Sequence, residues 1–159
     1  MRVEILAIGR LKDEAETDIV ARYQKRFDQT GRACGLGPLS ITEFPESRAA
    51  SAAERKVHEA ERLIAAAGRS HLIVLDVSGR SFTSEAFARH LQGLADQATR
   101  SCAFLIGGPD GHGELALAAA ALALSLGPLT LPHGLARVVL AEQLYRAATI
   151  LTGHPYHRP

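Results

Sequence analysis

The sequence predicts an α/β fold in which a parallel sheet carries helices on both faces. Short apolar runs alternate along the chain with longer segments whose apolar residues recur at helical spacing, an alternation typical of βα units. The run His71–Asp76 is mostly β-branched and apolar, as expected of a central parallel strand buried on both faces. The chain has 159 residues, enough to bury a sizeable core as a single domain spanning residues 1–159.

The first half of the chain predicts two strands, each followed by a helix. Val3–Ile8 is a short apolar strand, and Glu14–Asp28 is a polar helix with one apolar side. A glycine-rich loop then leads to a second strand, Leu39–Phe44. The capping box Ser51-Ala-Ala-Glu54 predicts the start of the next helix, with a start one turn earlier at Ser47 as the alternative, and Gly68 predicts its end.

The second half is predicted to continue the alternation. The strand His71–Asp76 should break at Ser78-Gly79, because these residues interrupt regular strand pairing. The elements expected after this break are a helix, a strand, a short helix, a strand and a long closing helix, at Ser84–Leu94, Cys102–Ile106, Glu114–Ala121, Leu122–Ser125 and Leu135–Thr152.

Composition narrows the classes of partner and compartment. Lys and Arg total 18 against 17 Asp and Glu, so the chain lacks the general basic field of promiscuous nucleic-acid binders. Cys34 and Cys102 form no CxxC motif, which argues against a zinc site or a disulfide scaffold and favours a reducing compartment. The amino-terminal apolar run is too short for a signal or transmembrane segment. We therefore expect a cytoplasmic protein without membrane association, and the spacing of its seven histidines compels no metal site.

Three predicted strand ends, at Asp76, Gly107 and Gly127, indicate where a ligand binds. In parallel α/β sheets, ligands lie beyond the carboxyl ends of the strands. Two of these ends run into segments rich in glycine and proline, 105–111 and 126–133. Such segments resist regular pairing and leave backbone N–H and C=O groups free for a ligand. A tight turn without a ligand is the alternative for the first segment.

Four familiar site motifs are excluded. The loop Gly107–Gly113 is followed by Glu114-Leu115, where a phosphate-binding loop needs Lys and then Ser or Thr, and it does not match the GxGxxG pattern of dinucleotide sites. The sequence also lacks GxSxG and HExxH. The prediction is therefore a backbone-lined pocket for a ligand other than a nucleotide phosphate or a dinucleotide.

The closing helix and the tail carry the remaining polar groups of interest. The helix is apolar on most sides, so we expect both the sheet and a second subunit to cover it. Its Glu142 and Arg146 either pair with each other or leave the arginine to face an anionic substrate. The tail 153–159 combines two imidazoles, a phenol and a guanidinium, groups that suit an unstacked base and its phosphates. The histidines outside these segments, His112 among them, are expected to be surface or packing residues.

Four segments together resemble one family: Leu105-Ile-Gly-Gly-Pro-Asp-Gly, Leu129-Thr-Leu-Pro-His, Arg137-Val-Val-Leu-Ala-Glu-Gln-Leu-Tyr-Arg and His154-Pro-Tyr-His-Arg. On these motifs, and on length and element order, the sequence is similar to the SPOUT class of RNA methyltransferases over essentially the whole chain. The resemblance implies a C-terminal trefoil knot that binds S-adenosylmethionine, and a homodimer. It further implies methylation of N3 of a pseudouridine in large-subunit (23S) ribosomal RNA, within the assembled ribosome.

Carried over by position, the resemblance also implies site residues. The cofactor would be lined by Leu75, Gly108, Gly127, Pro128, Leu129, Thr130, Leu131 and Pro132, and a bulky residue in place of Gly108 would occupy the ligand's space. The candidates for catalysis are His133, Arg146, His157 and Arg158, and those for substrate binding are Arg137, His154 and Tyr156. Which histidine takes the N3 proton stays open. The alternatives are a SPOUT methyltransferase with another RNA target and a non-enzymatic α/β binding module.

Overall fold

The computed structural model describes residues 1–158; Pro159, the last residue of the tail, lies outside the described residues. In chain order the elements are β1 (Arg2–Ile8), α1 (Glu14–Gly31), the 3-10 turn η1 (Arg32–Cys34), β2 (Leu39–Phe44), α2 (Ala52–Ala67), β3 (His71–Ser81), α3 (Ser84–Asp96), β4 (Ser101–Ile106), α4 (Glu114–Ala119), β5 (Leu122–Ser125) and α5 (His133–Leu151). None of the helices in residues 1–158 is both long and apolar enough to cross a membrane.

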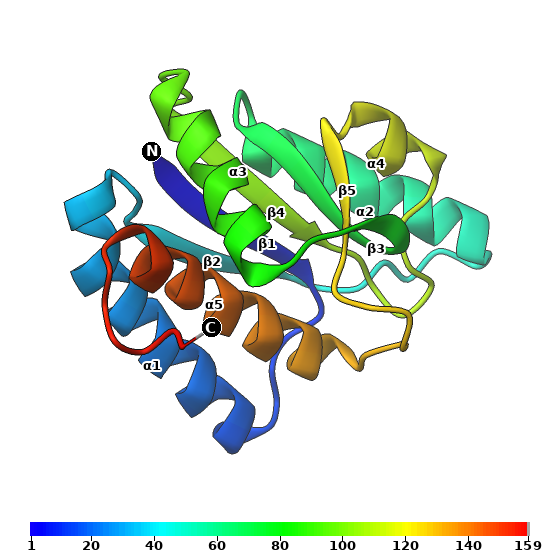
Figure 1. Ribbon diagram of the computed structural model, residues 1–159. Helices are drawn as coiled ribbons and strands as arrows, with labels where there is room; N and C mark the ends of the chain where they lie inside the picture. Colours follow the sequence, from blue (N-terminus) through cyan, green and yellow to red (C-terminus); the bar gives the residue numbers. More distant parts are fainter. Residues whose placement is uncertain (159) are drawn as a thin grey trace.

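The strands form one parallel sheet in the order β2-β1-β4-β3-β5. Helices α1, α3 and α5 cover one face of this sheet, and α2 and α4 cover the other (Figure 1). The predicted α/β class, with helices on both faces, is confirmed. Because β4, β3 and β5 are neighbours and run in the same direction, their carboxyl ends meet at one edge of the sheet, and this edge positions the candidate site.

Each face of the sheet has its own apolar core. Phe27, Phe87 and Leu144 belong to the core beneath α1, α3 and α5, where Phe87 meets Phe104 of β4 edge to face with ring centroids 6.1 Å apart. Leu63 of α2 belongs to the core on the opposite face. Burying each side chain of this size stabilises the fold by roughly 1.5–3 kcal/mol relative to leaving it in water. Two cores of this kind hold the central strands, and therefore their ends, in place.

Helix α2 begins and ends where the sequence predicted. Ser51 Oγ accepts a hydrogen bond from Glu54 N, and Glu54 Oε2 accepts one from Ser51 N, both at 3.2 Å. At the other end, Gly68 N donates to Ile64 O at 3.1 Å. These caps define both ends of α2, which carries Arg55 and Glu59, two residues that contact the loop of the candidate site.

The predicted break in the third strand is wrong. β3 continues through Ser78-Gly79 and pairs with β5 on both sides of a register shift between Leu75 and Arg80. A Cβ on Gly79 would lie 2.6 Å from the carbonyl atoms of Ala123 in β5. Glycine is required here because β5 passes so close to the irregular part of β3, and the residue therefore marks a bulge within the strand rather than its end.

Candidate functional site

A cavity of about 300 Å³ opens at the carboxyl ends of β3, β4 and β5. Its wall comes from the end of the regular part of β3, from the loop after β4 and from the segment that joins β5 to α5. Asp76, Gly107 and Gly127, the three predicted strand ends, all lie in this wall. The wall also contains six of the predicted cofactor residues, whereas Pro128 and Pro132 are only chain neighbours of wall residues; the six are Leu75, Gly108, Gly127, Leu129, Thr130 and Leu131.

The loop after β4 fits tightly because its first two residues are glycines. A Cβ on Gly107 would lie 3.0 Å from the Gly111 backbone, and one on Gly108 would lie 2.6 Å from Glu59 Oε2. Glu59 is only 4% exposed; its Oε1 accepts from Ser47 N at 2.9 Å, and its Oε2 has no hydrogen-bond partner among the described residues. A side chain at position 108 would therefore collide with Glu59 of α2, in addition to any ligand that the resemblance places beside it.

An ion pair ties the same loop to α2. Arg55 Nε donates to Asp110 Oδ2 at 2.7 Å, and Arg55 Nη2 donates to Asp110 Oδ1 at 3.2 Å. Arg55 Nη1 also donates to Ala49 O at 3.1 Å. The hydrogen bonds from Arg55 lower the pKa of Asp110, so the carboxylate is ionised and its charge is offset by the guanidinium.

Two further titratable groups lie in the cavity wall. Asp76 Oδ1 accepts from Ser78 Oγ at 2.6 Å and from Ser78 N at 2.9 Å, and these bonds hold the pKa of Asp76 below its usual value. His112 Nε2 lies 3.0 Å from Leu105 O, and burial lowers the pKa of His112, so the ring is neutral and donates to that carbonyl. The expectation that His112 is only a surface or packing residue was incomplete, because this side chain forms part of the wall.

The segment between β5 and α5 forms the outer side of the cavity. Gly127 has a φ of 128°, which an L side chain rarely adopts, and Ser125 Oγ bonds both the N–H and the C=O of Gly127, at 3.2 and 3.1 Å. Leu129 is 77% exposed at this side of the cavity. His133, the first residue of α5, also lines the cavity, and it is the one predicted catalytic residue that does so within residues 1–158.

Arg137, a predicted substrate-binding residue, lies in the core of the protein. Its side chain is 1% exposed, and it makes an ion pair with Glu43 at the end of β2. Arg137 Nη2 also donates to Ile8 O at 3.0 Å and to Gly9 O at 2.7 Å. Burial lowers the pKa of Arg137 and Glu43 raises it. These bonds join α5 to the ends of β1 and β2, and a substrate could reach the guanidinium only if they broke.

Three other predicted residues lie outside the cavity: one is on α5 and two are in the tail. Arg146 Nη2 donates to Glu142 Oε1 at 2.6 Å, so the expected pair within α5 is present. Tyr156 Oη donates to the same oxygen at 2.9 Å, and its ring lies 4.6 Å from that of Tyr145. His157 Nε2 approaches Glu85 Oε1 of α3 at 3.1 Å. None of these three predicted residues, Arg146, Tyr156 and His157, belongs to the cavity wall of its own chain in the described structure.

The remaining two tail candidates are exposed. His154 Nδ1 accepts a hydrogen bond from Tyr156 N at 3.1 Å, which shapes the turn of the tail. Arg158 extends into solvent beyond the contacts that His157 makes. The structure therefore brings six of the eight cofactor candidates and His133 together in one cavity, and it places Arg146, Tyr156 and His157 away from that cavity, against other parts of the chain.

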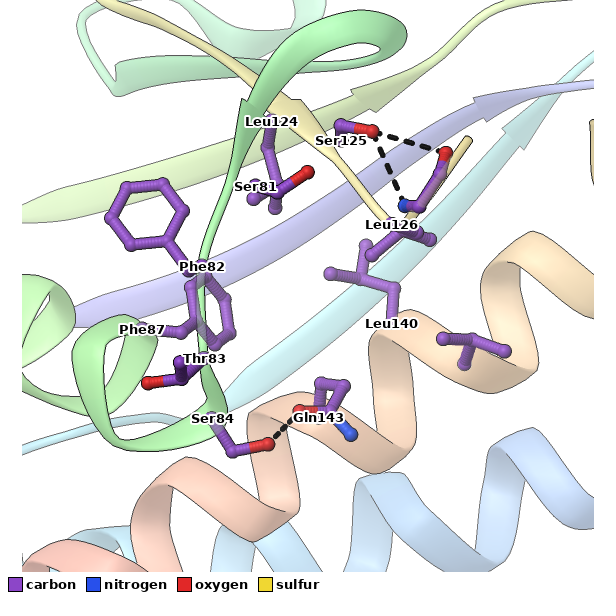
Figure 2. Close-up of a pocket in the computed structure, with 12 residues that line it drawn as sticks. Ser81, Phe82, Thr83, Ser84, Phe87, Leu124, Ser125, Leu126, Leu140 and Gln143 are labelled. Atoms are coloured by element: carbon purple, nitrogen blue, oxygen red, sulfur yellow. Dashed lines mark hydrogen bonds between the residues drawn. The ribbon is translucent and has the colours of Figure 1, made fainter. Parts of the chain in front are cut away.

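A second cavity, of about 290 Å³, lies between β3, α3 and α5 (Figure 2). It shares Leu124, Leu126 and Gly127 with the first cavity, so the strand end of β5 separates the two. Ser84 Oγ of α3 donates to Gln143 Oε1 of α5 at 2.9 Å across it. No sequence pattern predicted this cavity, because its wall depends on how α3 and α5 cross over the sheet.

Metal ligands do not cluster in the part of the chain that the structure describes. No three side chains of His, Cys, Asp or Glu within residues 1–158 are arranged to hold a metal ion. The free thiols of Cys34 and Cys102 are likewise apart from both cavities, and burial raises the pKa of Cys102 to about 12.

Comparisons with known proteins agree along the whole chain. The family model described as "Predicted SPOUT methyltransferase" matches residues 1–157. The chain is 47% identical over 159 residues to the ribosomal RNA large subunit methyltransferase H of Brucella anthropi, and 48% identical over 159 residues to the protein of the same name from Bradyrhizobium diazoefficiens. Each of these alignments covers 99% of this chain and 99% of the relative.

Proposed function

Because the chain belongs to the SPOUT methyltransferase family, we propose that it methylates N3 of a pseudouridine in large-subunit ribosomal RNA with S-adenosylmethionine as methyl donor. The curated relatives carry the name of a large-subunit ribosomal RNA methyltransferase and match nearly all of the chain. The substrate is the RNA within the assembled ribosome. Contact with this RNA is local, so the protein needs no general basic surface, which accounts for its net charge of only +1. The protein works in the cytoplasm.

The observation that carries the proposal is the chemical character of the cavity at the ends of β3, β4 and β5. Among the described residues, its wall contains Asp76 and Asp110 but no lysine or arginine. Such a wall disfavours phosphate groups and suits a ligand that carries positive charge. S-adenosylmethionine fits this requirement through its sulfonium and amino groups. In the proposal its flat adenine ring packs against the leucines of the wall. The ring edge forms hydrogen bonds with backbone N–H and C=O groups of the glycine-rich segments, which lie outside regular strand pairing.

The residues of the chain must hold the donor, exclude water and accept the proton that N3 loses. When bound, S-adenosylmethionine supplies an electrophilic methyl group on a sulfonium. His133 lies in the cavity wall at the start of α5, which supports the proposal that its imidazole accepts the N3 proton. In this proposal the base enters beside the exposed Leu129. Holding the base in line with the methyl group is the larger part of catalysis, because positioning replaces a bimolecular encounter.

A homodimer completes this site in the proposal. Arg146 of α5 and the tail candidates Tyr156, His157 and Arg158 carry the groups that suit a nucleotide. Those with described contacts face α1, α3 and α5 of their own chain. In a dimer, the tail of one subunit lies against the cavity of its partner and holds the RNA there. The proposal includes the trefoil knot of the family, since α5 returns from the edge strand β5 to pack against both α1 and α3.

The direct test is a comparison of ribosomes from a deletion strain before and after incubation with the protein and S-adenosylmethionine. Mass mapping of the large-subunit RNA should find one additional methyl group on a pseudouridine, only when both are present. Methylation of a different nucleotide would assign the enzyme to another RNA target, and no methylation together with no donor binding would favour a binding module.

A complementation experiment tests the shared site. One variant lacks residues 153–159, and a second, Thr130→Trp, fills the cavity from an exposed position of its wall. Each homodimer should be inactive, whereas co-expressed subunits should recover part of the activity, because the mixed dimer pairs an intact cavity with an intact tail. Failure of the mixture to recover any activity would show that cavity and tail act within one chain.

A further inference from the structure

Apart from its histidines, the wall of the cavity at the ends of β3, β4 and β5 contains two charged side chains. One of them has no ion-pair partner among the described residues. Of its two carboxylates, Asp110 makes a two-point ion pair with Arg55, at 2.7 and 3.2 Å. Asp76 makes no ion pair with a lysine or arginine of residues 1–158, and its bonds come from the neutral donors of Ser78. Hydrogen bonds stabilise the carboxylate of Asp76 without cancelling its charge.

One oxygen of Asp76 stays available. The two bonds from Ser78, at 2.6 and 2.9 Å, both end on Oδ1. Oδ2 accepts no hydrogen bond in the described structure, and it is not among the side-chain oxygens that are buried without a partner. The serine therefore fixes the carboxylate at the irregular part of β3 and leaves Oδ2 open to whatever occupies the cavity. The described part of the wall contains no lysine or arginine, and burial lowers the pKa of His112. The charge of Lys56, outside the wall, helps to lower the pKa of Asp76 but forms no ion pair with it.

We propose that Asp76 is the specificity residue that makes the cavity prefer the charged methyl donor to its spent product. This inference rests on the proposed function, in which the donor loses its methyl group to the RNA. The transfer breaks the S–CH3 bond, and the bonding pair stays on sulfur, so the sulfonium becomes the neutral thioether of S-adenosylhomocysteine. A fixed carboxylate attracts the first form and has much less attraction for the second, which favours exchange of product for fresh donor. For a partly buried pair of charges, the difference is on the order of tenfold in affinity.

Calorimetric titration of the full-length protein with both ligands tests this assignment without relying on activity. Asp76→Asn should weaken binding of S-adenosylmethionine by about tenfold more than binding of S-adenosylhomocysteine. Asp76→Glu, which keeps the charge, should retain the wild-type ratio of the two affinities. Asp18→Asn removes the same charge from an exposed site on α1 and should leave both affinities unchanged.

Three results of the titration would count against the role of Asp76 or against the proposed function. Equal weakening of both ligands by Asp76→Asn would overturn the inference, because it would mean that Asp76 contacts a part common to donor and product. Unchanged affinities would overturn it as well. If the wild-type protein bound neither ligand, the proposed function itself would fail, and this outcome is distinct from a loss confined to the variant.

Discussion

Arg137 offers the sharpest test of what the structure adds to the sequence, because the sequence predicts a substrate contact and the structure shows a buried structural cation. The perturbation is Arg137→Met, which keeps much of the side-chain volume and removes the guanidinium. Three partners then lose a charged donor: the carboxylate of Glu43 and the carbonyls of Ile8 and Gly9. Removing one partner of a buried ion pair costs about 3–5 kcal/mol.

The lower end of that range applies to Arg137. The side chain of Glu43 is 29% exposed and keeps a hydrogen bond from Leu11 N at 3.0 Å, so water and this amide partly satisfy it. We therefore expect Arg137→Met to lower the free energy of unfolding by about 3 kcal/mol. With a urea dependence of about 2 kcal/mol/M, this loss moves the unfolding midpoint down by roughly 1.5 M.

The assay is equilibrium unfolding in urea, followed by far-ultraviolet circular dichroism at one fixed protein concentration. Arg158→Met is the matched control, because Arg158 is exposed, and its free energy of unfolding should stay within about 0.5 kcal/mol of wild type. If Arg137→Met unfolded at the wild-type midpoint but no longer methylated ribosomes, the structural role would be refuted and a substrate contact would take its place.

Three smaller predictions concern the loop after β4. Gly108→Ala should destabilise the protein by roughly 1–3 kcal/mol through its overlap with Glu59, and Glu59→Ala should recover part of that loss; purely additive effects in thermal denaturation would contradict the contact. Arg55→Met should weaken donor binding in calorimetry, because its pair with Asp110 holds the loop. It should change the free energy of unfolding by less than about 1 kcal/mol, since that pair is partly exposed. An unaltered affinity would show that the pair does not hold the loop. Burial lowers the pKa of His112 in the folded protein below the value of about 6.5 that it has in the unfolded chain. As the pH falls below about 6.5, the unfolded chain therefore binds a proton more readily than the folded protein, and stability is lost. His112→Gln should therefore flatten the decline of Tm between about pH 7 and pH 5, and an identical decline in both proteins would count against it.

The elements and the cavity were predictable because local chemistry determines them. The capping box at Ser51 and the glycine at position 68 mark the ends of α2 in any context. The convergence of Asp76, Gly107 and Gly127 follows from parallel strands alone, since every carboxyl end then lies at one edge of the sheet. The pattern failed at Gly79, where the residue serves the close approach of β5, a feature that only the packed strands reveal.

The i,i+4 pair of Glu142 and Arg146 was predictable, but the partners of the other charged side chains were not, because they are distant in sequence. Apolar neighbours in the closing helix indicate that Arg137 is mostly buried, but its partner Glu43 lies 94 residues away. The contact between His157 and Glu85 depends in the same way on how the tail crosses α3. His112 appears as one more residue of a glycine loop until the turn of that loop brings its ring to Leu105 O.

The central claim is that the cavity at the ends of β3, β4 and β5 binds S-adenosylmethionine. A crystal structure of the protein grown with this compound tests it most directly. The ligand should lie against Leu75, Gly108 and Leu131, with its positive charge toward Asp76. Ligand bound only in the second cavity, beside Ser84 and Gln143, or no bound ligand at a concentration that saturates the protein in solution, would contradict it.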